Sequence, residues 1–207
     1  MKRYLQLALQ ILFLALFVFL IISGNVQLWM GLFVLSVLAI FLLGRVYCGW
    51  ICPINTVMRG ITWVKKKLRI KSIKTPAWMT KPWVRIFVLA LFIAVFIFTM
   101  VSGKKLPVLP ALLIIGAALT LFFSEELWHR YLCPYGTLMS LAARKSKYAM
   151  SIQPERCNSC GMCIRACPAK AVEKREDHYQ ILKKDCIVCM DCSNVCKQEA
   201  IHYRQVF

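Results

Sequence analysis

Long uncharged apolar stretches alternate with short polar segments in the first part of the chain. No charged residue occurs from Leu5 to Gly44, and only the polar, turn-forming segment 23–27 interrupts this run. Because lipid offers no partners to backbone N–H and C=O groups, an apolar segment of about 20 residues is expected to cross a bilayer as a helix. The pattern therefore predicts four transmembrane helices in two hairpins, at residues 5–22, 28–43, 86–101 and 106–123.

A different pattern follows the second of these stretches. Apolar residues recur at helical spacing at Ile54, Val57, Met58, Ile61, Val64 and Leu68. This spacing predicts an amphipathic helix that lies on the inner leaflet. The basic segment 65–69 would permit nucleic-acid binding in isolation. Beside membrane helices it favours anionic lipid headgroups, so the predicted partner is membrane lipid and not nucleic acid.

Composition and charge divide the chain into two parts. Hydrophobic residues make up 59% of it, yet 27 Lys+Arg stand against 9 Asp+Glu, a formal charge of +18. The low charged fraction excludes a disordered chain, and the long apolar runs exclude a disulfide scaffold. No acidic residue precedes Glu125, and eight of the eleven cysteines follow Arg156. We predict a membrane domain at 1–146 and a cysteine-rich soluble domain at 147–207.

The basic residues also predict the orientation in the membrane. Two of them precede the first apolar stretch, ten lie within 45–85, and further ones follow the fourth stretch, whereas only Lys104 and Lys105 lie on the other side. Both termini and the cysteine-rich domain are therefore expected on the cytoplasmic side of the inner (cell) membrane, in a multi-pass protein. The first stretch could be read as a signal peptide, but segment 22–25 is a poor cleavage site, and we interpret the stretch as a membrane helix.

The C-terminal cysteines form two copies of the spacing C-x2-C-x2-C-x3-C. The first copy is Cys157, Cys160, Cys163 and Cys167, followed by Pro168; the second is Cys186, Cys189, Cys192 and Cys196, followed by Lys197. This doubled spacing is the bacterial pattern for two [4Fe–4S] clusters, in which the fourth cysteine, expected on a helix, binds the other cluster. The first cluster is predicted on Cys157, Cys160, Cys163 and Cys196, and the second on Cys186, Cys189, Cys192 and Cys167. Zinc sites do not normally show this spacing.

The segments around these cysteines predict a small α+β domain. Strand candidates are 149–152, 171–173, 179–182 and 201–203, and a short helix is expected after each cysteine triplet. Lys197 stands where the first motif has Pro168. Its positive charge near a cluster would raise the reduction potential.

The membrane domain contains an internal repeat. Segment 48–58 (CGWICPINTVM) aligns with segment 129–139 (HRYLCPYGTLM), each just after an apolar hairpin. Parallel repeats of this kind pack about an axis along the membrane normal, which would bring the two motifs together. Four residues would then converge as ligands of a third iron–sulfur cluster: Cys48, Cys52, Cys133 and His129. Two alternatives stay open: His129 accepts a proton from a bound quinol without a cluster, or the three cysteines are packed, inert thiols.

These motifs together resemble the NapH/NosR-type membrane polyferredoxins. The resemblance rests on segment 44–53 (GRVYCGWICP), segment 130–136 (RYLCPYG) and the doubled ferredoxin motif, and it covers nearly the whole chain. It implies a quinol-linked electron-transfer subunit with cytoplasmic clusters inside a larger respiratory assembly. Some members of the family act instead as accessory or maturation factors. The chain departs from the family at His129, where the second motif usually begins with cysteine.

The predicted function is a membrane-bound iron–sulfur electron-transfer subunit that links a cytoplasmic redox partner to the quinone pool. Residues expected near a quinone are Trp50, Trp128, His129 and Tyr131. The sequence shows no glycine-rich phosphate loop and no nucleophile triad, so the chain is expected to work within an oxidoreductase complex, with the cofactors doing the redox chemistry, rather than as a stand-alone enzyme. The alternative is an accessory, maturation or redox-sensing factor that supplies electrons for the assembly of another metalloenzyme.

Overall fold

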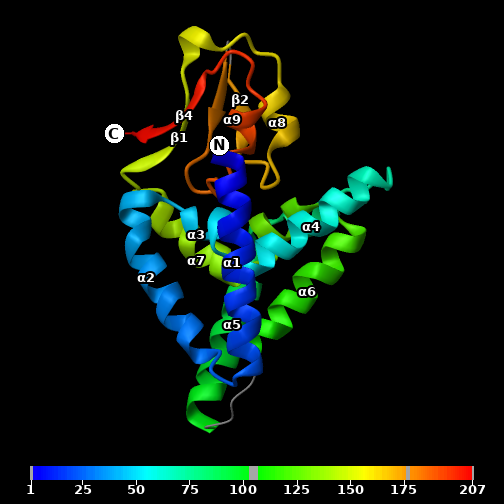
Figure 1. Ribbon diagram of the computed structural model, residues 1–207, viewed down its shortest axis with the longest axis vertical. Coiled ribbons are helices and arrows are strands. Elements are labelled where there is room, and N and C mark those ends of the chain that lie inside the picture. The colour runs from blue at the N-terminus through cyan, green and yellow to red at the C-terminus, as the bar shows by residue number, and fades with distance from the viewer. Residues whose placement is uncertain (1, 103–106, 176–177, 207) are drawn as a thin grey trace. The chain divides into compact units, whose positions relative to one another are not determined.

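A computed structural model describes residues 2–102, 107–175 and 178–206, and its elements are labelled in Figure 1. Two compact units result from the contacts between residues. The first unit comprises Met1–Thr56 and Met139–Phe207, and the second comprises Val57–Leu138. The predicted domains 1–146 and 147–207 follow composition rather than these units, and their boundary stays a prediction.

Each predicted apolar stretch forms a helix. These helices are α1 (Lys2–Ile22), α2 (Gln27–Leu43), α5 (Pro82–Ser102) and α6 (Val108–Phe122). Arg3–Ile22 and Pro82–Thr99 are long and apolar enough to cross a membrane, whereas α2 and α6 are shorter apolar helices. The expected start of the fourth helix at Leu106, and the loop lysines Lys104 and Lys105, lie outside the described residues.

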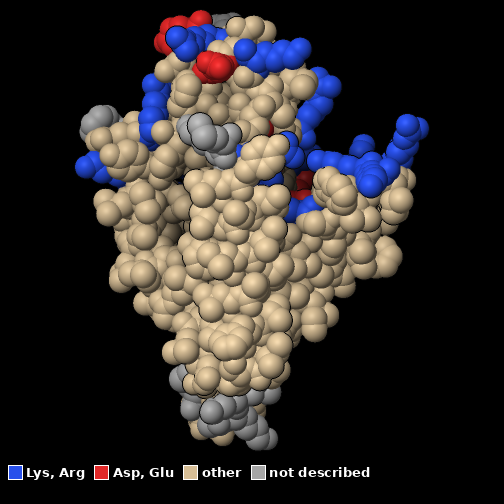
Figure 2. Space-filling model, in the orientation of Figure 1, with Lys and Arg blue, Asp and Glu red and all other residues tan. Residues whose placement is uncertain are grey.

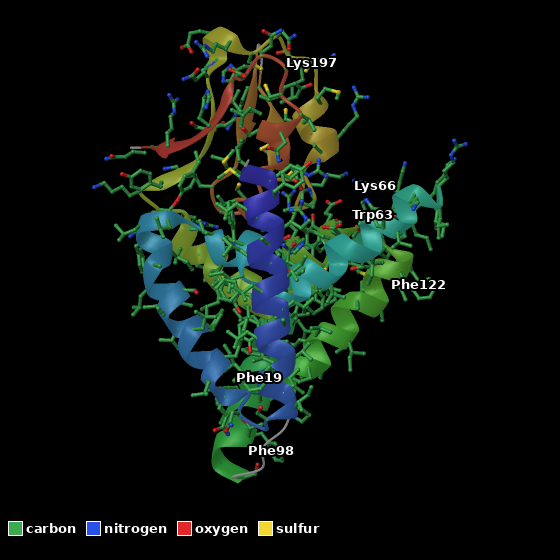
Figure 3. The ribbon with its side chains drawn as sticks, in the orientation of Figure 1. Phe19, Trp63, Lys66, Phe98, Phe122 and Lys197 are labelled. Atoms are coloured by element: carbon green, nitrogen blue, oxygen red, sulfur yellow. The ribbon has the colours of Figure 1, made fainter. Side chains whose placement is uncertain are left out.

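These helices present large apolar side chains outward. Only 17% of the apolar window in α1 and 6% of that in α5 is buried within the protein. Phe19, Phe98 and Phe122, on three different helices, are each more than half exposed (Figure 3). Helices that are apolar on their outer faces are expected in lipid rather than in water.

The first unit also contains the cysteine-rich part, which folds as predicted into short strands. β1 (Tyr148–Ile152) pairs antiparallel with β4 (Ile201–Gln205), and Ile152 faces Ile201 in the register. β2 (Val172–Lys174) pairs antiparallel with β3 (Tyr179–Ile181). Residues from all four strands and both cysteine motifs form one hydrophobic core: Met150, Ile152, Cys163, Val172, Ile181, Val188, Cys192, Ala200 and Ile201.

The short helices of this part differ from the prediction. α8 (Met162–Ala166) and α9 (Asp191–Asn194) begin before the third cysteine of each triplet, not after it. A left-handed residue immediately before each helix, Gly161 or Met190, turns the chain sharply enough to start it there. The fourth cysteines, Cys167 and Cys196, consequently lie just beyond the helix ends rather than on a helix. The short 3-10 segment η3 (Pro154–Arg156) precedes the first motif.

The remaining elements surround the two Cys-Pro motifs. In the first unit α3 (Val46–Trp50) carries Cys48 and packs against α1 and α2. In the second unit the 3-10 helix η1 (Ala77–Thr80) and the helices α5 and α6 pack against η2 (Leu127–Leu132), a π-helix that carries His129. α4 (Pro53–Lys67) and α7 (Pro134–Ala143) follow the two motifs.

The basic end of α4 is only partly exposed. On the visible face, Figure 2 shows Lys and Arg along this helix, whereas the sequence of α6 contains no charged residue. Lys66 and Lys67 are exposed, as expected for contact with lipid headgroups. Lys65 is not: it is buried, and its Nζ donates to the carbonyl oxygen of Thr120 at 2.9 Å. The prediction that this lysine faces lipid was wrong, because a cation is stabilised by the free carbonyls at a helix C-terminus.

Candidate iron–sulfur centres

The two ferredoxin motifs share one backbone conformation. Residues with positive φ occur at Ser159, Gly161 and Lys170, and again at Val188, Met190 and Glu199. The offset is the same 29 residues that separates Cys157 from Cys186. Left-handed residues within such a loop turn successive N–H groups toward one side and create a concavity suited to an anionic group. Five of these six residues are not glycine, so the backbone is strained at equivalent positions of both loops.

Two backbone N–H groups donate hydrogen bonds to cysteine sulfur atoms. The N–H of Ala171 donates to Cys167 Sγ at 3.2 Å, and the N–H of Val188 donates to Cys186 Sγ at 3.4 Å. Burial raises the pKa of Cys167, and the hydrogen bond from Ala171 opposes that rise. Hydrogen bonds of this kind stabilise a ligated, negatively charged sulfur.

Four cysteines predicted for the first cluster line one cavity. Cys157, Cys160 and Cys163 come from the first triplet, and Cys196 comes from the end of the second motif. Tyr179 and Ile152 complete part of the wall. Soft thiolates at this spacing suit an iron–sulfur cluster, and the donor set therefore fits the group that the doubled motif predicts.

The other four cysteines lie close enough to influence one another's ionisation. Burial, the largest cause, and the charge of the neighbouring Cys167 raise the pKa of Cys186 to about 12. Burial is also the largest cause of the raised pKa values of Cys189 and Cys192, to which Cys167 and Cys186 add. Buried thiols that oppose each other's ionisation need positive charge to become thiolates, and cluster iron would supply it. Within the described residues, no three or more His, Cys, Asp or Glu side chains are arranged to hold a single metal ion.

The loop 187–189 of the second motif rests directly on α3 in the first unit. A Cβ atom on Gly49 would overlap the carbonyl oxygen of Ile187 and would lie 3.0 Å from that of Val188. The indole N–H of Trp50 donates to the Val188 carbonyl at 3.0 Å. Trp50, which was predicted near a quinone, thus contacts the loop of a ferredoxin motif.

Two buried glutamines of α1 complete this junction. Gln6 Nε2 donates to the carbonyl oxygen of Cys189 at 3.2 Å and to that of Gly49 at 3.0 Å. Gln10 Nε2 donates to the same Gly49 oxygen at 2.8 Å. The sequence interpretation assigned no role to either residue. The available signal was two amides four residues apart in an otherwise apolar helix, where a polar group needs a partner.

The first Cys-Pro motif is enclosed within the first unit. Cys48 is buried, and its Sγ lies 3.5 Å from Met139 Sδ and 3.8 Å from Arg45 Nη2. Cys52 is half-buried, and its backbone N–H donates to the carbonyl of Tyr47. Arg45 is fully buried, a feature that the sequence interpretation missed.

The second Cys-Pro motif lies in the second unit at the end of η2. Cys133 is half-buried and accepts a hydrogen bond from the N–H of Gly136 at 3.2 Å. His129 and Trp128 are buried on the π-helix, and Tyr131 is half-buried there. Such helices are frequent at functional sites. The convergence of Cys48, Cys52, Cys133 and His129 on one cluster stays a prediction.

Charged side chains gather beside His129 in the second unit. Its Nε2 lies 3.9 Å from Glu125 Oε2, and both residues are buried. Burial lowers the pKa of Lys65, and the charge of Glu125 opposes that shift. The sequence interpretation gave Glu125 no role, although it is the first acidic residue of the chain and lies four residues before His129.

Two family descriptions match the chain. A 4Fe–4S binding domain matches twice, at residues 25–71 and 106–152, and a 4Fe–4S dicluster domain matches residues 156–201. The two matches of the first domain begin 81 residues apart, the same distance as from Cys52 to Cys133, in agreement with the internal repeat. The matches support the predicted [4Fe–4S] cofactors.

Curated relatives include proteins named for ferredoxin-type functions. An uncharacterized protein of Methanocaldococcus jannaschii is 29% identical over 82% of this chain and 68% of its own length. Ferredoxin-type protein NapH of Haemophilus influenzae is 26% identical over 79% of this chain and 63% of its length. Methylamine utilization ferredoxin-type protein MauN of Methylobacillus flagellatus is 29% identical over 60% of this chain and 48% of its length. The chain thus spans about half to two thirds of these relatives, and no solved structure matches it.

Proposed function

We propose that the chain, which is similar to the ferredoxin-type proteins NapH and MauN, is a NapH-type polyferredoxin that carries single electrons between a cytoplasmic redox partner and the quinone pool of a membrane. The [4Fe–4S] clusters supply one-electron chemistry when bound. The cysteines of the two ferredoxin motifs hold them in the crossed arrangement: Cys157, Cys160, Cys163 and Cys196 for the first, and Cys186, Cys189, Cys192 and Cys167 for the second.

The contact between the 187–189 loop and α3 is the main observation in support of this proposal. Electron transfer into the membrane requires a ferredoxin centre close to the membrane part of the protein. Gly49 lies against the backbone of this loop, and Gln6 of α1 donates to the carbonyl of Cys189, a ligand proposed for the second cluster. The second cluster therefore stands on the membrane side of the electron path, and the first, whose ligand Cys160 is exposed, stands on the side of the partner.

The apolar helices anchor the protein in the inner (cell) membrane as a multi-pass protein. All four of α1, α2, α5 and α6 span or enter the hydrocarbon layer, with both termini and the ferredoxin motifs in the cytoplasm. Lys66 and Lys67 of α4 contact anionic headgroups at that surface. The partners are membrane lipid and the other subunits of a respiratory or redox complex.

We expect about twelve iron atoms and twelve acid-labile sulfides per chain in protein purified without oxygen. Two clusters on the ferredoxin motifs account for eight of them, and a third on Cys48, Cys52, Cys133 and His129 for the other four. Chemical iron and sulfide analysis with EPR of the reduced protein measures both. A value of about eight, unchanged in Cys133→Ala, would remove the third cluster from the proposal and leave the ferredoxin pair intact.

The link to quinone has its own test. A short-chain quinol added to the oxidised protein under anaerobic conditions is expected to bleach the iron–sulfur absorbance, and His129→Asn is expected to slow that bleaching at least tenfold. His129 lies beside Glu125, a carboxylate able to take up the quinol proton. Stopped-flow absorbance measures the rate, and dithionite serves as the control reductant. If dithionite bleaches the clusters and the quinol does not, the quinone link is wrong although the iron–sulfur carrier stands.

A further inference from the structure

Arg45 buries a full positive charge at the start of α3. Its side chain is 1% exposed, and its Nη1 donates to the carbonyl oxygen of Lys184 at 3.2 Å. Its Nη2 lies 3.8 Å from Cys48 Sγ. A guanidinium keeps its proton at every pH at which a protein is folded, so burial cannot be relieved by neutralisation. A buried charge of this kind needs compensating negative charge nearby.

The segment that Arg45 contacts leads directly into the second ferredoxin motif. Lys184 is two residues before Cys186, a cysteine proposed to bind the second cluster. The hydrogen bond from Arg45 therefore holds the guanidinium against the segment that carries this ligand.

A cluster held by four thiolates carries net negative charge, and reduction adds one more. A fixed positive charge nearby favours the reduced state. The effect is strong where water is excluded and weak where water screens it. Arg45 is buried, whereas Lys197 and Arg165, the basic residues beside the ferredoxin cysteines Cys196 and Cys167, are exposed. The position of Lys197 is labelled in Figure 3.

We propose that Arg45 is a positioning residue whose buried guanidinium serves as the counter-charge to the second cluster. This charge raises the reduction potential of the second cluster above that of the first. The same side chain links the Cys48 motif to the second ferredoxin motif. The inference rests on the proposed iron–sulfur function. Of the two clusters, the second would then hold an electron more strongly, and its motif lies against α3.

The loop has other anchors, so the charge can be removed without removing the whole junction. Gln6 and Trp50 donate to the carbonyls of Cys189 and Val188 independently of Arg45. Arg45→Gln keeps a long polar side chain and deletes the charge, and Arg45→Lys keeps the charge and deletes the planar fork. Arg165→Gln, which removes an exposed arginine between Cys163 and Cys167, is the matched control.

The test is an anaerobic redox titration of the full-length protein in detergent, followed by EPR. The potential of the second cluster is identified as the one that is lost in Cys186→Ala. Arg45→Gln is expected to lower the equilibrium constant for reduction of that cluster about tenfold, which corresponds to about 59 mV for a one-electron couple. Arg45→Lys and Arg165→Gln are expected to change it less than threefold, and the first cluster is expected to stay unchanged in all three variants.

Iron analysis distinguishes a failure of the proposed iron–sulfur function from a failure of the role of Arg45 alone. Wild-type protein with less than about eight irons would contradict the proposed function itself. An Arg45→Gln protein with wild-type iron content and an unchanged second potential would overturn the role of Arg45 alone, as would equal shifts of the potentials of the first and second clusters. If Arg45→Gln does not assemble the second cluster, the Arg45→Lys variant tests the role of the charge. Assembly of the second cluster in that variant with a near wild-type potential supports the counter-charge. Loss of the cluster in that variant contradicts it.

Discussion

Cys160→Ala combined with Cys167→Ala is expected to remove about eight irons per chain, whereas Cys160→Ala combined with Cys196→Ala is expected to remove only about four. In the crossed arrangement Cys160 and Cys196 serve the same cluster, so the second substitution of that pair removes nothing further. Cys160 and Cys167 serve different clusters, and both are lost. Each single substitution is expected to remove about four irons.

The expectation follows from the cavity that brings Cys157, Cys160, Cys163 and Cys196 together. The antiparallel pairing of β1 with β4 holds the end of the second motif beside the start of the first. Ligands that act as a unit give strongly non-additive losses, and ligands of separate sites give additive ones. Iron and sulfide analysis of the three single and two double variants is the measurement. The reverse result, with the larger loss in the Cys160–Cys196 pair, would show that each cluster is held by four consecutive cysteines.

Gly49→Ala is expected to destabilise the junction between α3 and the 187–189 loop by about 1–3 kcal/mol, the usual cost of overpacking a filled site. The added methyl group would overlap the carbonyl oxygen of Ile187 and lie 3.0 Å from that of Val188 and 3.1 Å from the Cys189 nitrogen. All three neighbours are backbone atoms, which cannot rotate away as a side chain can. The strain falls on the loop that carries Cys189, so the second cluster is expected to be lost more readily than the first.

The midpoint of thermal bleaching of the iron–sulfur absorbance in detergent reports this loss. Gly31→Ala is the matched control, since it places the same methyl group on α2 with no atom within 4 Å. The control is expected to leave the midpoint unchanged or slightly higher, because alanine favours a helix over glycine. Equal midpoints for Gly49→Ala and the wild type would show that α3 is not tightly packed against the loop.

Local patterns of the sequence predicted most of the elements. The apolar stretches became α1, α2, α5 and α6, and the spacing over 54–68 became α4. The four short strands appear close to their predicted ranges because they flank cysteines at set spacing. The start of α8 and α9 was misplaced, because a left-handed residue precedes each helix, Gly161 before α8 and Met190 before α9. The turn at Met190 leaves no pattern in the sequence, because the residue is not glycine. Lys65 was misassigned because its partner, the carbonyl of Thr120, is 55 residues away.

By itself the sequence determined the cofactor class, since the spacing of eight cysteines encodes a backbone that wraps clusters within a few residues. It also determined the apolar helices and the repeat of the Cys-Pro motif, because both depend only on residue type and local distance along the chain. Only the tertiary structure decided that Gln6, Arg45 and Gly49 meet the second ferredoxin motif. Those contacts join segments well over a hundred residues apart, and they depend on complementary shape and on buried polar groups finding partners. No local pattern in the sequence predicts which segments make these contacts.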